Sequence, residues 1–259
     1  MHSPLQTLFS FVRSLVHALW MLFTVIPVAL YMVAATPFAS AQHMYAAARF
    51  FLWCAMHGLR VICGVRWQLQ GYANLPTEKT SPAVLLVKHQ STLETFLMPL
   101  IMPHPLAYVF KKELLYVPFF GWGIGRCDMI HIDRKQGKLA FGKVVEQGKR
   151  LLAQGVWVIM FPEGTRIPRG QTGNYKTGGT RLAIETGAPV IPIAVNSATV
   201  WPRKGFIKYP GTVTVVIGQA IPSQGRESEE LMRQVQSVIE AEMQQLDPSA
   251  YPQLAQKAA

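Results

Sequence analysis

The sequence predicts an α/β fold, with a mainly parallel central sheet flanked by helices and a hydrophobic helical pair at the N-terminus. Strand-like and helix-like stretches alternate from about residue 65 onward, which is the pattern of strands joined by helical crossovers. Several strand-like stretches, such as 156–161 and 190–195, are continuous apolar runs, as in strands that are covered on both faces. Before them, residues 14–48 contain no Asp, Glu, Lys or Arg.

Residues 1–65 are predicted to form membrane-associated hydrophobic helices. A bilayer-spanning helix needs about 20 apolar residues, and the run 14–35 is long enough despite Pro27. A second apolar run, 50–65, is short and is interrupted by Arg60. Three arrangements therefore remain open: a transmembrane span, a helical pair inserted into one leaflet, and a buried hairpin of a soluble domain.

Residues 66–247 are predicted to form the globular domain, and 248–259 a flexible tail. Apolar β-forming runs predict strands at 67–71, 83–88, 107–110, 129–132, 156–161, 190–195 and 212–217. Amphipathic or helix-forming runs predict helices at 92–101, 139–154, 178–186 and 229–245. The segment 117–125 is rich in aromatic residues and glycine and has no clear assignment.

The charge and cysteine content limit the kinds of molecule that the protein is expected to bind and the compartment in which it is expected to work. The net charge is +11, and between residues 134 and 208 there are 13 Lys and Arg against three Glu. Such a domain attracts anions, but no zinc-finger, RNP-type or helix-turn-helix signature supports nucleic acid. An anionic membrane or a phosphorylated substrate fits better. The three cysteines are Cys54, Cys63 and Cys127. Their odd number and irregular spacing argue against a disulfide framework or a zinc site, so we expect buried thiols in a reduced, cytosol-facing protein.

The stretch Val87–Thr95, VKHQSTLET, places a histidine at a predicted strand-to-helix turn. His89 follows the strand, and Glu94 lies in the first turn of the helix. An imidazole and a carboxylate at this spacing are suited to act as a general base and its orienting partner. The alternative is that Glu94 closes a capping box with Ser91 and that His89 has no chemical role.

The stretch 161–166, FPEGTR, follows the most hydrophobic strand, and ligands of α/β sheets bind beyond such strand ends. Gly164 lets a ligand approach the backbone, and the Arg166 guanidinium is suited to phosphate. Glu163 is expected either to hold a substrate hydroxyl or to fix Arg166. The alternative is a surface turn with an ordinary Glu–Arg pair.

A third stretch, KKELLYVPFFGWGIG at 111–125, precedes HIDR at 131–134. Lys111 and Arg134 end adjacent predicted strands, so both side chains are expected to face one crevice. His131 and Asp133 alternate with isoleucines and are interpreted as structural residues of a half-buried strand.

These blocks, in this order and together with VIPIAV at 190–195, resemble the four motifs of the glycerolipid acyltransferases, and most closely the bacterial 1-acyl-sn-glycerol-3-phosphate acyltransferases. The resemblance covers about residues 83–196. Two positions depart from the family pattern. Glu94 stands where the first motif usually ends in Asp, and Lys88 stands where Asn is common.

The resemblance implies acyl transfer from acyl-CoA or acyl-carrier protein to the sn-2 hydroxyl of lysophosphatidic acid, which gives phosphatidic acid. His89 and Glu94 would be catalytic. Lys111, Arg134, Glu163, Gly164, Thr165 and Arg166 would bind substrate. No metal and no cofactor beyond the acyl donor is expected, and the expected location is the bacterial inner membrane with the active site facing the cytoplasm.

Three other functions remain open. An acyltransferase acting on glycerol 3-phosphate or another lysolipid would depend less on the basic residues if its acceptor lacks phosphate. A non-catalytic lipid-binding protein would bind anionic lipid without needing His89. A hydrolase would use His89 to activate water, although the chain has no GxSxG elbow.

Overall fold

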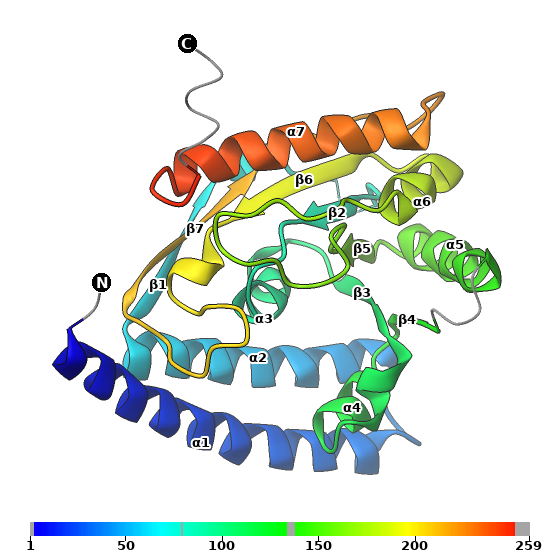
Figure 1. Cartoon of the computed structure of the whole chain (residues 1–259). Coiled ribbons are helices and arrows are strands. Elements are labelled where there is room, and N and C mark those ends of the chain that lie inside the picture. Colours follow the sequence, from blue (N-terminus) through cyan, green and yellow to red (C-terminus); the bar gives the residue numbers. More distant parts are fainter. Residues whose placement is uncertain (1–2, 79, 134–137, 252–259) are drawn as a thin grey trace.

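A seven-stranded sheet forms the centre of the protein in the computed structural model (Figure 1). The structure describes residues 3–78, 80–133 and 138–251. The strand order is β1-β7-β6-β2-β5-β3-β4. The strands are β1 (Val65–Gln70), β2 (Val84–Val87), β3 (Leu106–Lys111), β4 (Ile130–Ile132), β5 (Trp157–Met160), β6 (Val190–Val195) and β7 (Gly211–Ile217).

Most of the sheet is parallel, which confirms the predicted fold class. β2 lies between β5 and β6 and is parallel to both, and β3 is parallel to β5 and to β4. The exception is the antiparallel pairing of β6 with β7. Because β1 is parallel to β7, these two strands at one end of the sheet run opposite to the other five.

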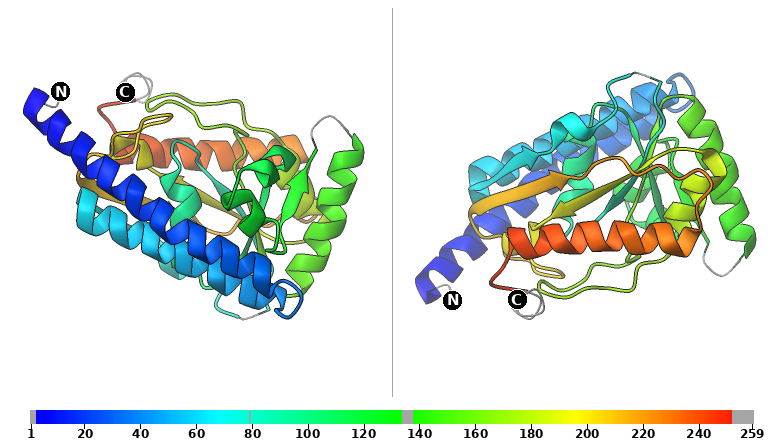
Figure 2. Two further views of the ribbon diagram at one scale, coloured as in Figure 1. Left: turned by 90° about the horizontal axis from the view of Figure 1, so that it is seen from below. Right: turned by 90° about the horizontal axis from the view of Figure 1, so that it is seen from above.

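Helices cover both faces of the sheet (Figure 2). One face carries α5 (Lys138–Ala153), α6 (Gly178–Thr186) and α7 (Ser228–Leu246), and the other carries α2 (Ala41–Cys63) and α3 (Leu93–Ile101). A hydrophobic core lies on each face of the sheet, and successive residues of β2 point into different cores. Leu85 packs in the core beside α2 and α3, and Leu86 packs in the core beside α5, α6 and α7. Both are fully buried, as expected for a strand covered on two faces.

The N-terminal helices are longer than predicted. Helix α1 spans Pro4–Ala35 and continues through Pro27, and α2 begins at Ala41 because Ser40 caps it and its polar first turn is helical. Both are long and apolar enough to cross a membrane by length and composition. The two pack closely at Gly58, where a Cβ would lie 2.4 Å from the Trp20 ring.

Helix α1 leaves most of its apolar side chains exposed, whereas α2 lies between α1 and the sheet (Figures 1 and 2). Exposed side chains of α1 include Leu5 at 76% and Phe23 at 74%. This exposed apolar surface of α1, continued by Phe50 and Trp53 of α2, is called the apolar face below.

The unassigned aromatic segment folds into two short helices, η2 (Lys112–Tyr116) and α4 (Phe120–Ile124). Helix α4 lies against α1, and η2 packs on α4 (Figure 1). Gly121 permits this turn, because a Cβ there would lie 2.4 Å from the Leu115 carbonyl oxygen. The first part of the predicted flexible tail is also ordered. Tyr251 is buried and its hydroxyl accepts a hydrogen bond from Gln90 Nε2, so residues 248–251 belong to the domain; residues 252–259 lie outside the described ranges.

Candidate active site

The turn between β2 and α3 brings His89 and Glu94 together. The distance from His89 Nδ1 to Glu94 Oε1 is 3.0 Å. Because a carboxylate only accepts hydrogen bonds, Nδ1 carries the proton and Nε2 is the basic nitrogen. The Glu94 side chain is fully buried, and the His89 side chain is 14% exposed. The pair therefore has the geometry of a general base held by an orienting carboxylate.

Glu94 also organises the backbone of the turn. Its Oε1 accepts hydrogen bonds from the amides of Gln90 and Ser91, each at 2.7 Å, and its Oε2 accepts one from the Ser197 hydroxyl at 2.6 Å. The helix begins one residue later than predicted, at Leu93, and its cap residue is Thr92. The two sequence interpretations of Glu94 thus hold together, since one carboxylate both closes the turn and contacts the imidazole.

The imidazole of His89 lies flat against Phe161, with ring centroids 3.8 Å apart and planes 14° apart. Phe161 directly follows β5, and His89 follows the neighbouring parallel strand β2. Carboxyl ends of adjacent parallel strands meet at one edge of the sheet, which is why residues so distant in sequence come into contact. The stacking and the Glu94 contact together fix the orientation of the ring.

The FPEGTR loop folds over the same strand ends. Gly164 has φ +65°, a conformation that favours glycine. The loop is tied to the catalytic turn, because the Ile167 amide donates to the His89 carbonyl oxygen at 2.7 Å and Arg166 Nη1 donates to Thr92 Oγ1 at 2.8 Å. Gly164, Thr165 and Arg166 line the cavity described below.

Glu163 faces away from this cavity. Its carboxylate is buried, with Oε2 accepting from the His89 amide at 3.0 Å and Oε1 from Lys88 Nζ at 2.7 Å. The expected pairing of Glu163 with Arg166 is wrong: the buried ammonium of Lys88 is the ion partner of Glu163. The expected contact with a substrate hydroxyl stays a prediction.

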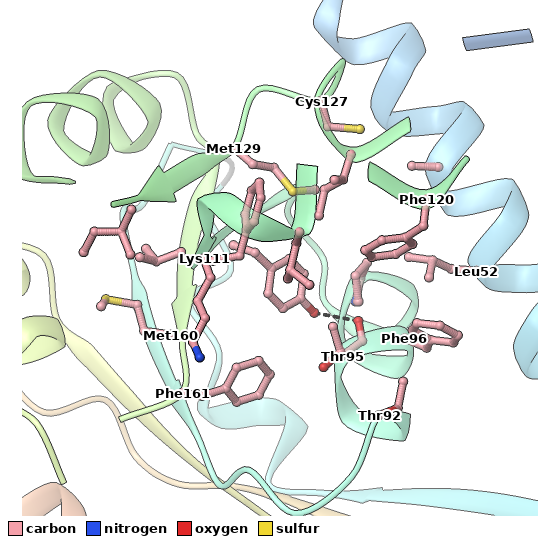
Figure 3. A pocket seen from close by; sticks show the side chains of 18 of the residues that line it. Leu52, Thr92, Thr95, Phe96, Lys111, Phe120, Cys127, Met129, Met160 and Phe161 are labelled. Atoms are coloured by element: carbon pink, nitrogen blue, oxygen red, sulfur yellow. Dashed lines mark hydrogen bonds between the residues drawn. The ribbon is translucent and has the colours of Figure 1, made fainter. Parts of the chain in front are cut away.

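Lys111 ends β3 and lines the cavity, and Figure 3 shows its side chain extending toward Phe161. β4 lies beside β3, with Lys111 opposite Ile132. The predicted partner Arg134 lies outside the described residues. His131, expected to be structural, is exposed on β4.

A cavity of about 810 Å³ opens at His89 and extends between the sheet and the N-terminal helices. Apolar side chains form much of its wall, and Figure 3 shows several of them, including Leu52, Phe96 and Phe120. From α1 to α4 they include Val25, Met32, Leu52, Phe96, Phe120 and Ile124, while Met160 comes from β5 and Met129 from the segment before β4. Among the described residues, four basic side chains join the lining: Lys111, Arg166 and Lys176 come from the strand ends and loops around His89, and Arg49 comes from α2. The cavity thus combines a long apolar compartment with a cationic region beside the imidazole.

Cys127 also lines this cavity, and burial raises the pKa of its thiol to about 12. The thiol is therefore neutral at physiological pH and a poor nucleophile. All three cysteines are buried and free, as expected from their spacing.

Four residues that contribute to the site were not singled out as site residues from the sequence: Lys88, Phe161, Ser197 and Glu240. Glu240 lies on α7 and bonds to Lys88 across 152 positions of the chain, so no local pattern could reveal it. Phe161 and Lys88 lie next to recognised motif residues, but their contacts depend on the packing of strands. The only available signal for Lys88 was its departure from the family pattern.

A histidine–carboxylate pair at the strand ends of an α/β sheet, opening on a largely apolar cavity beside two membrane-type helices, defines a base-catalytic site for a lipid-like ligand. The acyltransferase family profile matches residues 66–196. The chain is 45% identical over 203 residues to the 1-acyl-sn-glycerol-3-phosphate acyltransferase of Pseudomonas aeruginosa, covering 77% of this chain and 76% of the relative. The chain belongs to the acyltransferase family, which confirms the resemblance of the motifs.

Two further matches agree. The human 1-acyl-sn-glycerol-3-phosphate acyltransferase alpha is 32% identical over 139 residues, which is 54% of this chain and 48% of the human protein. The crystal structure of the 1-acyl-sn-glycerophosphate acyltransferase PlsC from Thermotoga maritima superposes with a TM-score of 0.75 at 22% identity. It covers 92% of this chain and 98% of PlsC, and at that identity it supports the fold alone.

Proposed function

We propose that the protein transfers an acyl chain from acyl-CoA or acyl-carrier protein to the sn-2 hydroxyl of 1-acyl-sn-glycerol 3-phosphate and so makes phosphatidic acid for phospholipid synthesis. The observation that carries the proposal is the His89–Glu94 pair at the mouth of the largely apolar cavity. The relatives named for this activity support the same acceptor.

In the proposed reaction, His89 Nε2 takes the proton of the acceptor hydroxyl as its oxygen attacks the thioester carbonyl. The tetrahedral intermediate collapses with cleavage of the carbon–sulfur bond, and the imidazolium returns the proton to the departing thiolate. Glu94 stabilises the imidazolium through the contact to Nδ1, as the aspartate does in serine-protease triads. The acceptor alcohol is itself the nucleophile, so no acyl-enzyme forms.

The remaining residues suit the two substrates. Lys111 and Arg166 would contact the acceptor phosphate, with Lys176 nearby, because cationic side chains lining one end of a cavity attract an anionic group. Gly164 and Thr165 would face the glycerol. The apolar compartment between the sheet and α1 and α2 would receive an acyl chain, whose burial stabilises the complex by about 0.8 kcal/mol per methylene.

The protein is also proposed to sit on the cytoplasmic side of a bacterial inner membrane, with the apolar face in one leaflet. Helix α2 buries residues along its whole length, from Met44 to Cys63, against α1 and the domain. A transmembrane orientation of the pair would carry the basic domain into the hydrocarbon, whereas insertion of the apolar face alone leaves it in water.

The test is acyl transfer by the purified, detergent-solubilised protein. Lysophosphatidic acid, glycerol 3-phosphate and a neutral lysolipid serve as competing acceptors, with acyl-CoA and acyl-carrier protein as alternative donors. We expect phosphatidic acid from lysophosphatidic acid, formed about a hundred- to ten-thousandfold more slowly in His89→Ala. The control is His43→Ala, which replaces an exposed histidine of α2 that does not line the cavity and should keep the full rate. Full activity in His89→Ala would refute the mechanism, and binding of anionic lipid without transfer would favour the lipid-binding alternative.

A further inference from the structure

Lys88 directly precedes the proposed catalytic base, and its ammonium is entirely buried. Nζ donates to Glu163 Oε1 and to Glu240 Oε1, both at 2.7 Å, and to the Gln171 carbonyl oxygen at 3.2 Å. The Lys88 and Glu163 side chains are 0% exposed and that of Glu240 is 10% exposed. A lysine is almost never buried in this way unless it is paired, and this one has two carboxylates.

The first carboxylate leads to the catalytic turn. Glu163 Oε2 accepts the hydrogen bond of the His89 amide at 3.0 Å, while Oε1 binds Lys88 and the Gly173 amide, the latter at 3.2 Å. Glu163 therefore joins three segments: the end of β2, the FPEGTR loop and the loop that follows it. Its rotamer decides whether the backbone of His89 is held.

The second carboxylate comes from the C-terminal helix. Glu240 Oε1 accepts from Lys88 Nζ and from the Tyr175 hydroxyl at 2.7 Å, and Oε2 accepts from the Thr172 hydroxyl at 2.7 Å. Two carboxylates around one ammonium leave one formal negative charge, which these neutral donors help to stabilise. Without Lys88, both carboxylates would be buried close together with no cation between them.

We propose that Lys88 and Glu240 are positioning residues, which hold the Glu163 carboxylate on the His89 amide and thereby fix the base relative to the cavity. This inference rests on the proposed function, because it assigns these residues a role in the rate of that reaction. Removal of the Lys88 charge leaves Glu163 and Glu240 to repel each other, so Glu163 turns away or binds a proton. The His89 backbone then loses its anchor, and a displacement of about 1 Å can slow a reaction about a hundredfold.

A purely structural role would give a different result. Buried ion pairs contribute little net stability, since desolvation offsets their attraction, and apolar replacements of similar volume are often neutral. This cluster is instead joined to the backbone of the base by a single hydrogen bond, from the His89 amide to Glu163. Its loss should therefore lower kcat separately from any effect on folding or on acceptor KM.

The experiment compares Lys88→Met, Glu240→Gln and the double variant in the full-length protein, with kcat, acceptor KM and melting temperature measured for each. We expect kcat about a hundredfold lower in Lys88→Met and at least about fivefold lower in Glu240→Gln, with KM within threefold of the unaltered protein. Because Glu240 acts through Lys88, the double variant should be no slower than Lys88→Met alone, within about threefold.

Lys208→Met is the matched control. Lys208 is also a buried lysine, at 2% exposed, but it donates to the Phe206 carbonyl oxygen and lies over the Trp201 ring. It should lose stability without a fall in kcat below the melting temperature. Equal kcat losses in the Lys88 and Lys208 variants, or additive losses in the double variant, would overturn the inference.

The outcomes separate the two proposals. If the unaltered protein shows no acyl transfer, the proposed function itself is refuted. An active unaltered protein with a folded, fully active Lys88→Met variant would overturn only the positioning role. If Lys88→Met does not fold, Glu240→Gln decides, because it keeps every side-chain length in the cluster: unchanged kcat there refutes the inference.

Discussion

Replacing Glu94 with glutamine separates the charge of the orienting residue from its shape. The amide oxygen can occupy the place of Oε1 and keep the three hydrogen bonds from His89 Nδ1 and from the Gln90 and Ser91 amides. The amide nitrogen can donate to Ser197 Oγ, whose hydroxyl rotates to suit. The turn should therefore fold as before, with its negative charge removed.

The loss in rate follows from the strength of the contact to the imidazolium. A hydrogen bond to a charged group is about 1–2 kcal/mol stronger than one between neutral groups, which corresponds to roughly 5- to 30-fold in rate. Glu94 is fully buried, where electrostatic interactions are stronger than at the surface. We therefore expect kcat of Glu94→Gln to fall by roughly 30-fold or more, with an unchanged melting temperature.

The assay is phosphatidic acid formation at saturating acceptor and donor, beside Glu229→Gln as an exposed control on α7. A Glu94→Gln rate within twofold of the unaltered protein would refute the role assigned to the charge. Glu94→Asp tests the geometry instead. Its carboxylate is shorter by one methylene, about 1.5 Å, so the turn must move to keep its hydrogen bonds. We expect loss of both rate and melting temperature, because buried amides left unpaired cost about 1–3 kcal/mol each.

Three other predictions concern binding, the core and pH. Lys111→Ala should raise the KM for lysophosphatidic acid about tenfold, since a charge-assisted contact contributes about 1.5–3 kcal/mol. Lys112 lies outside the cavity lining, so Lys112→Ala should leave this KM unchanged. Steady-state kinetics measures both variants, and equal KM values would contradict the role assigned to Lys111. Leu85 lies in the centre of the sheet, so Leu85→Ala should lower the free energy of unfolding by about 2–5 kcal/mol. Leu22 is 54% exposed, so Leu22→Ala should lower it far less. Denaturation in detergent measures both values. Burial and the nearby Glu240 charge raise the pKa of Tyr175, so the unfolded chain loses this proton near pH 10 while the folded protein keeps it. The free energy of unfolding should therefore fall above pH 10, by about 1.4 kcal/mol per pH unit for this group. The fall should be less steep in Tyr175→Phe.

The sequence could predict the parts of the site that are local. His89 and Glu94 lie on one strand-to-helix turn, so their spacing alone indicated the pair. Arg166 follows a strand recognisable from its unbroken apolar run, and the motif order indicated the family. Each of these rests on residues within a few positions of one another or on the pattern of one element.

The parts that could not be predicted depend on long-range packing. The Ser197 contact to Glu94 joins residues 103 positions apart, and the Glu240 contact to Lys88 spans 152. The reversed direction of β7 was also hidden, because the apolar pattern of a strand does not encode which way it runs. The pairing of Glu163 was mistaken because Arg166 is nearer in sequence, whereas the nearest cation in the fold is the buried Lys88.

The C-terminal position of α7 affects the order in which the molecule can become complete during its synthesis. The apolar helices α1 and α2 precede every strand of the sheet in the chain and are therefore made before it. Glu240 and Tyr251, which contact Lys88 and Gln90 beside the base, leave the ribosome after all the other residues of the site. The nascent chain therefore has its long apolar helices well before it has the side chains that complete the environment of His89.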